Sequence, residues 1–488
     1  MVKNKVFLYN GISSAYADTD FSPSFSLMAL SAFLKQKNYK VTLLLNRFSN
    51  NKLRLLLKNC LGVAFSVYTG NGILYSLNMA KRIKEIYPHM PIIWGGYHPT
   101  LEPEQTIKHK LIDYVIRGQG EFTLAEVLFF LNDKHKNKLE SIDGLTYKMK
   151  GNILHNKPRK IMDINKLSRY DYGLYNHVYK KHSSIGYLTS RGCPFNCKFC
   201  CSAAFNSTGG ARYMQYSMER IVKDIKALIR NYKPAAIDFL DDNFFVNQKR
   251  IRSFVKAYKD NSFNFNWTAY ARCDTFSGFD DKLVDDLQKI NLVKIFFGVE
   301  SGSQRILDMV DKRITIRQVL KSVDKIGKLN ILSDFTFING FPQEKWSDVI
   351  KSLKLRNKIV SILPKASVRF FTFVPLPGTE MLKKCQRLGY QKPKKLTGWT
   401  FFEYHSFIGS WLKPVYQRLV TNISWAAFFD TFEEKSQNIL IKILFKILKI
   451  DAKLRFKLYF FSLAPEFQII NKIYRLKLKK NKVFKVVT

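Results

Sequence analysis

The sequence predicts an α/β protein in three parts: an N-terminal doubly wound, Rossmann-like parallel sheet, a partial (βα)6 TIM-like barrel, and a mostly helical C-terminal region. Two observations support the first two parts. Short apolar runs alternate with helical patterns twice along the 488 residues, and a polar stretch separates the two series. Apolar strands that alternate with helices are typical of parallel sheets with both faces covered. A basic amphipathic stretch after the second series predicts the third part. We place the domains at 1–135, 183–390 and 391–488, with a linker at 136–182.

The first predicted sheet has five apolar strands. They are residues 5–10, 40–45, 61–67, 91–96 and 112–118, with helices at 24–36 and 72–87. Ligands of open α/β sheets bind beyond the carboxyl ends of the strands. Those ends read SVYTGNG (66–72), GGYHPT (95–100) and RGQGE (117–121). Together they predict a ligand cleft, although turn glycines alone would explain any one of them.

The second series follows a linker that carries one predicted hairpin, 144–156. Its six strands are residues 185–190, 235–240, 265–271, 293–299, 333–338 and 368–374, with intervening helices such as 218–232 and 315–328. Six units are too few for a closed eight-stranded barrel, and barrel enzymes place their chemistry at the carboxyl ends of the strands. The loops at those ends are RGCPFNCKFC (191–200), DDNF (241–244), RCD (272–274), ESGS (300–303), NGFPQE (339–344) and PLPGTE (375–380).

The composition limits the binding partners and the cellular location that can be expected. The net charge of +42 suits nucleic acid, an anionic membrane, an acidic substrate or simply a lysine-coated surface. Seven cysteines, four of them within 193–201, do not form a secreted disulfide framework and predict a reducing, cytoplasmic location. We find no apolar run of the length that a signal peptide or a transmembrane helix needs.

Cys193, Cys197 and Cys200 form a CxxxCxxC group. A structural zinc site would need four ligands, usually from paired groups far apart in sequence, and no second group follows. A [4Fe–4S] cluster held by three thiolates fits better and leaves one iron free for a ligand. Cys201 is adjacent to the last ligand, and we expect it to face away from the cluster.

With CxxxCxxC after the first barrel strand, and with DDNF, GVESGS and PLPGTE in later loops, the sequence resembles the radical S-adenosylmethionine (SAM) superfamily. The N-terminal sheet, with GGYHPT and RGQGE, resembles the cobalamin-binding domain of one large subgroup. The resemblance implies a [4Fe–4S] cluster, SAM and cobalamin as cofactors. It also implies reductive cleavage of SAM to methionine and a 5′-deoxyadenosyl radical, followed by functionalisation of an unactivated carbon, most often by methyl transfer.

The resemblance also implies roles by position. It makes the three cysteines the cluster ligands, and it places five residues around SAM: Phe199, Asp241, Arg272, Glu300 and Ser301. The small residues at the first sheet's edge would line the cobalamin pocket: Ser66, Thr69, Gly70, Gly95 and Gly96. Two alternatives stay open. Asp241 and its neighbour Asp242 could cap the helix that begins near Asn247, and Arg272 could pair with Asp274 instead of SAM.

Two departures from the family pattern concern cofactor binding. Related cobalamin domains carry a DxHxxG motif whose histidine binds cobalt, but the matching loop, residues 9–22, has no histidine. His98 belongs to a different loop pattern. We therefore expect cobalt without a protein imidazole, or a domain that no longer binds cobalamin. In the fifth barrel loop, Gln343 stands where the GxPGE pattern has its second glycine.

Several function classes remain at this point. The leading one is cobalamin-dependent methyl transfer to a small-molecule or lipid-like substrate, with electrons from a donor such as flavodoxin or ferredoxin. A sibling reaction would cyclise or rearrange the substrate without methyl transfer. Transfer RNA methylthiolation is disfavoured, because such enzymes carry three more N-terminal cysteines and this chain has only Cys60 there. A non-enzymatic iron–sulfur protein that binds nucleic acid or membrane would leave the strand-end loops unexplained, and a nucleic-acid partner is not expected.

The C-terminal region concentrates the excess charge. In the predicted helix at 438–450, Lys442, Lys446 and Lys449 share one face among isoleucine, leucine and phenylalanine. Residues 472–485 carry seven basic residues and no acid: Lys472, Arg475, Lys477, Lys479, Lys480, Lys482 and Lys485. This pattern suits a helix that lies at an anionic membrane surface. A helix packed on the barrel, followed by a solvated tail, is the alternative.

Overall fold

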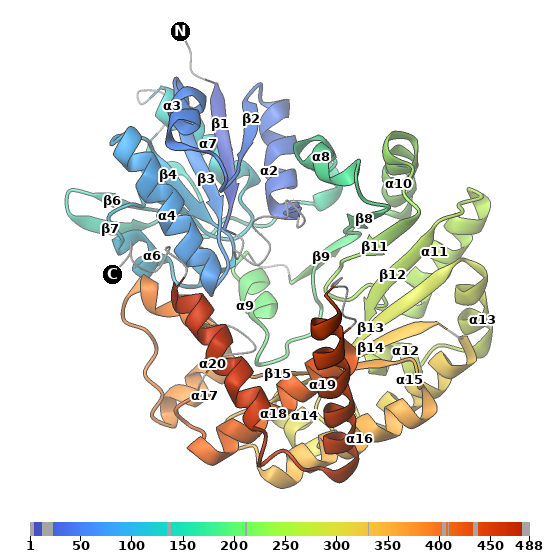
Figure 1. Ribbon diagram of the computed structural model, residues 1–488. Helices are drawn as coiled ribbons and strands as arrows, with labels where there is room; N and C mark the ends of the chain where they lie inside the picture. The colour runs from blue at the N-terminus through green and yellow to red at the C-terminus, as the bar shows by residue number, and fades with distance from the viewer. Residues whose placement is uncertain are drawn as a thin grey trace.

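The structure is a computed structural model. It describes residues 4–11, 23–133, 138–209, 212–329, 331–402, 407, 409–432 and 438–480, with 473–480 described as backbone only. Two sheets lie side by side, and the C-terminal helices pack along the lower part of the molecule (Figure 1). The predicted α/β fold with two parallel-dominated sheets and a helical C-terminal region is confirmed.

The N-terminal sheet has the order β2-β1-β3-β4-β5-β6-β7. Its strands are β1 (Lys5–Asn10), β2 (Lys40–Leu44), β3 (Cys60–Ser66), β4 (Ile92–Gly95), β5 (Tyr114–Ile116), β6 (Leu145–Met149) and β7 (Asn152–His155). The first five pair in parallel, as expected for continuous apolar runs. The predicted hairpin is confirmed as β6 and β7, and it pairs antiparallel with β5. The hairpin therefore extends the sheet.

Four longer helices cover this sheet: α2 (Phe25–Gln36), α3 (Asn50–Leu57), α4 (Asn71–Ile86) and α7 (Glu121–Asn132). The hydroxyl of Ser24 caps α2 by accepting from the Leu27 backbone N–H at 3.4 Å, which satisfies one of the unpaired donors of the first turn. β3 is buried along its whole length, because helices pack on both of its faces. Two short helices, α5 (Tyr97–Leu101) and α6 (Pro103–Lys108), follow β4.

The second sheet has six parallel strands in the order β15-β14-β13-β12-β11-β8. Their bounds are β8 (Ser184–Tyr187), β11 (Ala236–Phe239), β12 (Asn266–Ala271), β13 (Leu292–Glu300), β14 (Leu332–Asn339) and β15 (Ser367–Thr372). The helices between them are α10 (Met218–Tyr232), α11 (Gln248–Asp260), α12 (Cys273–Ser277), α13 (Asp281–Lys289), α14 (Gln304–Met309), α15 (Ile316–Leu329) and α16 (Trp346–Ile362). Among the described strands, none joins β8 to β15, so the barrel is partial, as predicted.

The loop between β8 and β11 holds a small antiparallel pair, β9 (Ser190–Gly192) with β10 (Tyr213–Gln215), and the helix α9 (Cys201–Ser207). α9 lies between the two sheets (Figure 1) and contacts α5 of the N-terminal part. The ion pair of Arg191 with Glu121, at 2.7 Å, also crosses this boundary. Both side chains are largely buried. Burial alone would lower the pKa of Arg191, but the Glu121 carboxylate raises it.

The C-terminal region packs against both the N-terminal part and the second sheet. After α17 (Glu380–Arg387), the turn η4 (Leu396–Phe401) packs on α4, and Trp399 is fully buried in the core beneath the N-terminal sheet. α18 (Pro414–Thr431) then packs on β15 at the edge of the second sheet, and α19 (Ile439–Leu458) packs on α18. The last helix is α20 (Pro465–Lys480). The predicted helix at 438–450 is confirmed and runs eight residues further.

Candidate active site

The three motif cysteines lie in one loop that directly follows Gly192, the last residue of β9. Gly192 has a φ of +78°, and a Cβ there would come within 2.1 Å of the Arg212 carbonyl oxygen, so no other residue fits. The backbone of Lys198 anchors the loop on two sides, donating to the Val310 carbonyl at 2.9 Å and accepting from the Met381 N–H at 3.1 Å. The thiols are free and only partly buried.

The thiols influence one another electrostatically, so they share one environment. Burial raises the pKa of Cys193 to about 11, with smaller contributions from Asp242, Cys200 and Cys197. Within the described residues, no three Cys, His, Asp or Glu side chains converge on a single metal ion. A tetrahedral zinc site needs such convergence, whereas the thiolates of an iron–sulfur cluster each bind a different iron. Three thiols on one loop can therefore serve as ligands of an iron–sulfur cluster without converging on one ion.

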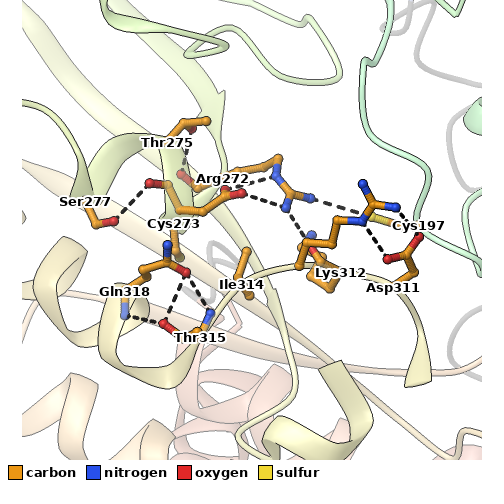
Figure 2. A network of polar contacts seen from close by, with 12 residues as sticks. Cys197, Arg272, Cys273, Thr275, Ser277, Asp311, Lys312, Ile314, Thr315 and Gln318 are labelled. Atoms are coloured by element: carbon orange, nitrogen blue, oxygen red, sulfur yellow. Dashed lines mark hydrogen bonds and ion pairs between the residues drawn. The ribbon is translucent and has the colours of Figure 1, made fainter. Parts of the chain in front are cut away.

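Arg272 and Lys312 bring two positive charges to this loop (Figure 2). The Arg272 guanidinium lies 3.6 Å from the Sγ of Cys197 and stacks on the Phe195 ring at 3.6 Å. It also donates to both carboxylate oxygens of Asp274, at 3.0 and 2.9 Å, and to the Lys312 carbonyl. The alternative ion pair with Asp274 is therefore present, together with a direct contact to a motif cysteine.

Glu300 ends β13 with a φ of +68°, and its carboxylate pairs with the Lys312 ammonium at 2.7 Å. Both side chains are at least 90% buried. A Cβ on Gly298 would come within 2.5 Å of Glu300 Oε1, so the glycine makes room for the pair. Burial lowers the pKa of Lys312, but Glu300 and the Cys197 thiol outweigh it, and the net pKa is raised. Phe199 lies beside the pair, with Lys312 Nζ 6.0 Å from its ring centre.

Two of the residues predicted to lie around SAM have hydrogen-bond partners within the barrel wall. Asp241 is buried and accepts from the backbone N–H and hydroxyl of Thr189 and from the Ser190 hydroxyl, so its carboxylate holds the start of β9. It does not cap α11, since Asn247 performs that role by accepting from the Arg250 N–H at 2.9 Å. Ser301 faces α16, where its hydroxyl lies 3.3 Å from that of Ser352.

A cavity of about 500 Å³ lies between the two sheets. The N-terminal sheet contributes Ser66, Gly95 and Gly96 from the predicted pocket residues, with Gly118 and Gly120 nearby. Residues of the barrel mouth form part of the facing wall: Leu188, Ser190, Arg191, Gly192, Phe205, Leu240 and Asp242. At Gly96, a Cβ would meet the Val67 backbone at 3.0 Å, so the cavity wall there is bare backbone. The volume falls within the range of small-molecule sites, roughly 300–1,000 Å³.

The other two predicted pocket residues do not reach the described lining. The Thr69 hydroxyl hydrogen-bonds to Nδ1 of His98 at 3.0 Å, and Gly70, with a φ of +104°, is the N-cap residue before α4. His98 is fully buried with its ring against Trp399, and burial lowers its pKa to about 3. His98 also lies outside the cavity lining. Residues 12–22, where a cobalt-binding histidine would have stood, lie outside the described residues.

Asp242 and Cys201 face the boundary between the two sheets. Asp242 lines the cavity and accepts from the Ser202 hydroxyl; burial raises its pKa. Cys201 is the first residue of α9. Burial raises the pKa of Tyr68 and Tyr97, and the Asp242 carboxylate and Cys201 raise it further. Tyr68 stacks on Tyr97 at 5.2 Å, and Tyr97 stacks on Phe205 at 4.5 Å.

Lys312 is the residue that sequence reasoning missed. It belongs to no strand-end motif, because it follows the short helix α14. The available signal was indirect: a carboxylate at the mouth of a barrel, if buried, requires a cation, and the lysine in the nearby sequence DKR (311–313) could supply it.

The chain is similar to known proteins in sequence and fold. The chain matches the Radical SAM superfamily over residues 187–356 and the B12 binding domain over residues 19–128. An uncharacterized methyltransferase of Pyrococcus horikoshii is 31% identical over 318 residues, or 64% of this chain and 67% of that protein. An anaerobic magnesium-protoporphyrin IX monomethyl ester cyclase of Synechocystis is 24% identical over 279 residues, or 56% of this chain and 54% of the cyclase.

Among solved structures, the cobalamin-dependent S-adenosylmethionine radical enzyme OxsB, with aqua-cobalamin and S-adenosylmethionine bound, superposes with a TM-score of 0.71 at 17% identity. The match covers 97% of this chain and 75% of OxsB, so the two proteins share a fold across both sheets. The chain spans about half to three quarters of the length of these relatives.

Proposed function

Because the chain belongs to the radical SAM superfamily and carries a B12-binding domain before the barrel, we propose that it transfers a methyl group to an unactivated carbon. The observation that supports this best is the cavity between the sheets, since one wall is the glycine-rich edge of the N-terminal sheet and the other is the barrel mouth beside the cysteine loop. A cofactor held by the first wall would face a substrate held by the second.

The proposed cofactors are a [4Fe–4S] cluster, SAM and cobalamin. Bound together, they would supply a carbon-centred radical that removes a substrate hydrogen, and a methyl group to replace it. Cys193, Cys197 and Cys200 would hold the cluster. Arg272, already in contact with Cys197, and Lys312 offer cationic donors for the SAM carboxylate.

We propose roles for the other site residues from the same arrangement of side chains. Glu300 would accept from the SAM ammonium or ribose hydroxyls, and the Phe199 ring would pack near the adenine. Because Asp241 and Ser301 already have partners within the wall of the barrel, we assign them a supporting role. Ser66, Gly95 and Gly96 would line the cobalamin pocket, with Thr69 and Gly70 shaping the turn behind it. No described histidine lines this cavity, so the cobalt would lack a protein imidazole.

The substrate is proposed to be a small or lipid-like molecule, and the electron donor a flavodoxin or ferredoxin. Cyclisation without methyl transfer is the second candidate, and the similarity to a cyclase favours it specifically. The two reactions differ in their SAM products. Both reactions release methionine and 5′-deoxyadenosine from one SAM, and methyl transfer also yields S-adenosylhomocysteine from a second SAM.

The test is anaerobic reconstitution with iron, sulfide and cobalamin, followed by SAM and dithionite. We expect about four irons per chain and formation of 5′-deoxyadenosine. Combined replacement of Cys193, Cys197 and Cys200 by alanine should abolish both, while the matched control Cys201→Ala should keep them. Mass spectrometry of extracts from a deletion strain then identifies the compound that lacks a methyl group. Zinc in place of iron in a clean anaerobic preparation would refute the proposal.

A further inference from the structure

Helix α19 exposes an unusually apolar face. Nine of its isoleucine and leucine side chains are 40–72% exposed: Ile439, Leu440, Ile441, Ile443, Leu444, Ile447, Ile450, Leu454 and Leu458. At about 100° per residue, most of them fall on one arc of the helix. The opposite arc carries Leu448, Ala452 and Phe456, which are buried against the rest of the protein. The helix is therefore packed on one side and apolar on the other.

A row of lysines borders the exposed apolar face. Lys442, Lys446, Lys449, Lys453 and Lys457 recur every three or four residues, so they share one flank of the helix. None of them takes part in an ion pair with a described residue. The one acidic residue of α19, Asp451, is paired with Arg455 at 2.7 Å, and Arg455 also pairs with Glu466. This flank of α19 therefore carries positive charge that no described acidic residue pairs with.

Four other surface helices of this chain bury their large apolar residues, and α3, α7, α16 and α18 each expose a single one. The amphipathic helices α10, α11, α13 and α15 contribute no large hydrophobic side chain to the exposed set among the described residues. Contiguous exposed apolar surface of this kind marks an interaction site. The α19 surface, defined by the nine apolar residues and the five lysines, continues into the turn before α20, where Phe460 and Leu463 are also exposed.

We propose that the α19 surface docks in the interface of a membrane that contains anionic phospholipid. The geometry points to a membrane because an apolar arc flanked by lysines matches the two layers of such an interface. The isoleucines and leucines would contact the acyl chains, and the lysines would contact the phosphate groups. No described helix is long and apolar enough to cross a membrane. Because α19 packs on α18 on its opposite side, its exposed surface would meet the membrane along the length of the helix. This surface does not depend on the reaction at the cysteine loop.

The experiment is vesicle flotation of the full-length reconstituted protein, with phosphatidylcholine alone and with phosphatidylcholine plus phosphatidylglycerol. We expect strong binding to the anionic vesicles only. Lys446→Gln with Lys453→Gln should weaken it about 30-fold, and Ile443→Gln with Ile447→Gln at least about tenfold. The matched controls are Lys223→Gln with Lys226→Gln on α10, and Leu55→Gln on α3, an exposed leucine away from α19. Neither should change binding.

Three outcomes would overturn the proposal. They are no binding to either vesicle, equal binding to both, and binding that the lysine pair reduces but the isoleucine pair does not, which indicates adsorption of a basic protein by charge alone. A fourth is a dimer in light scattering that Ile443→Gln with Ile447→Gln converts to a monomer, because a second copy would then cover the surface. Iron content and 5′-deoxyadenosine formation should stay at the wild-type level in all variants, which separates this test from that of the reaction.

Discussion

Replacing Lys312 by methionine tests the buried ion pair at the barrel mouth. The substitution keeps most of the side-chain volume but leaves the Glu300 carboxylate buried without a cation. Removing one partner of a buried pair costs about 3–5 kcal/mol, because the remaining charge is desolvated without compensation. For a barrel of this size, each kcal/mol lowers the melting temperature by about 2–4 °C, so a fall of about 6–20 °C is expected. Adding Glu300→Gln should recover most of this loss.

The assay is thermal unfolding of the four proteins of this double-mutant cycle, followed anaerobically by circular dichroism. Lys256→Met, which removes a surface pair with Asp260, is the matched control and should leave the melting temperature almost unchanged. A coupling energy below about 0.5 kcal/mol between Lys312 and Glu300 would refute the reasoning, since the pair would then not be electrostatically linked.

Three further predictions follow. Gly192→Ala should reduce iron per chain, because its Cβ would clash with the Arg212 carbonyl, while Gly151→Ala, also at positive φ but in open space, should bind iron normally. Burial raises the pKa of Glu344 to about 8, so the folded state holds a proton that the unfolded state releases above about 4.5. Stability should therefore fall by up to about 1.4 kcal/mol per pH unit between these values, and Glu344→Gln should remove this slope in urea unfolding at pH 5 and pH 8. The electron paramagnetic spectrum of bound Co(II) should lack imidazole nitrogen splitting and should not change in His98→Ala.

The sequence was sufficient for the architecture because strand periodicity and strand-end loops are local signals. The two sheets, the hairpin and the position of the CxxxCxxC loop are confirmed, and so is the resemblance to the radical SAM superfamily with its B12 domain. With enzymatic relatives on both parts, the non-enzymatic alternative is set aside. The roles of individual residues around SAM and cobalamin stay predictions.

The direction in which each site side chain points could not be predicted from the sequence. Asp241 and Asp242 are adjacent, yet one binds Thr189 inside the barrel wall and the other lines the cavity. The sequence could not show which of the two carboxylates faces the cavity. Neighbouring residues at a strand end face opposite sides, and either one can point inward. The role of Lys312 could not be predicted from the sequence for a related reason. Its partner Glu300 lies 12 residues away, and only the fold brings the two side chains together.

The burial of Trp399 beneath the N-terminal sheet has a consequence for how the chain is made. The hydrophobic core under β1, β3 and β4 includes Leu396, Trp399 and Phe402, and the Trp399 indole donates to Gln105 at 2.6 Å. A nascent chain therefore cannot complete the core under its first sheet until residues 396–402 have left the ribosome. Until then, the apolar side of α4 stays open to solvent and to chaperones. An isolated fragment ending near residue 135 would keep that exposed patch permanently, so it should aggregate unless residues 396–402 are supplied in trans.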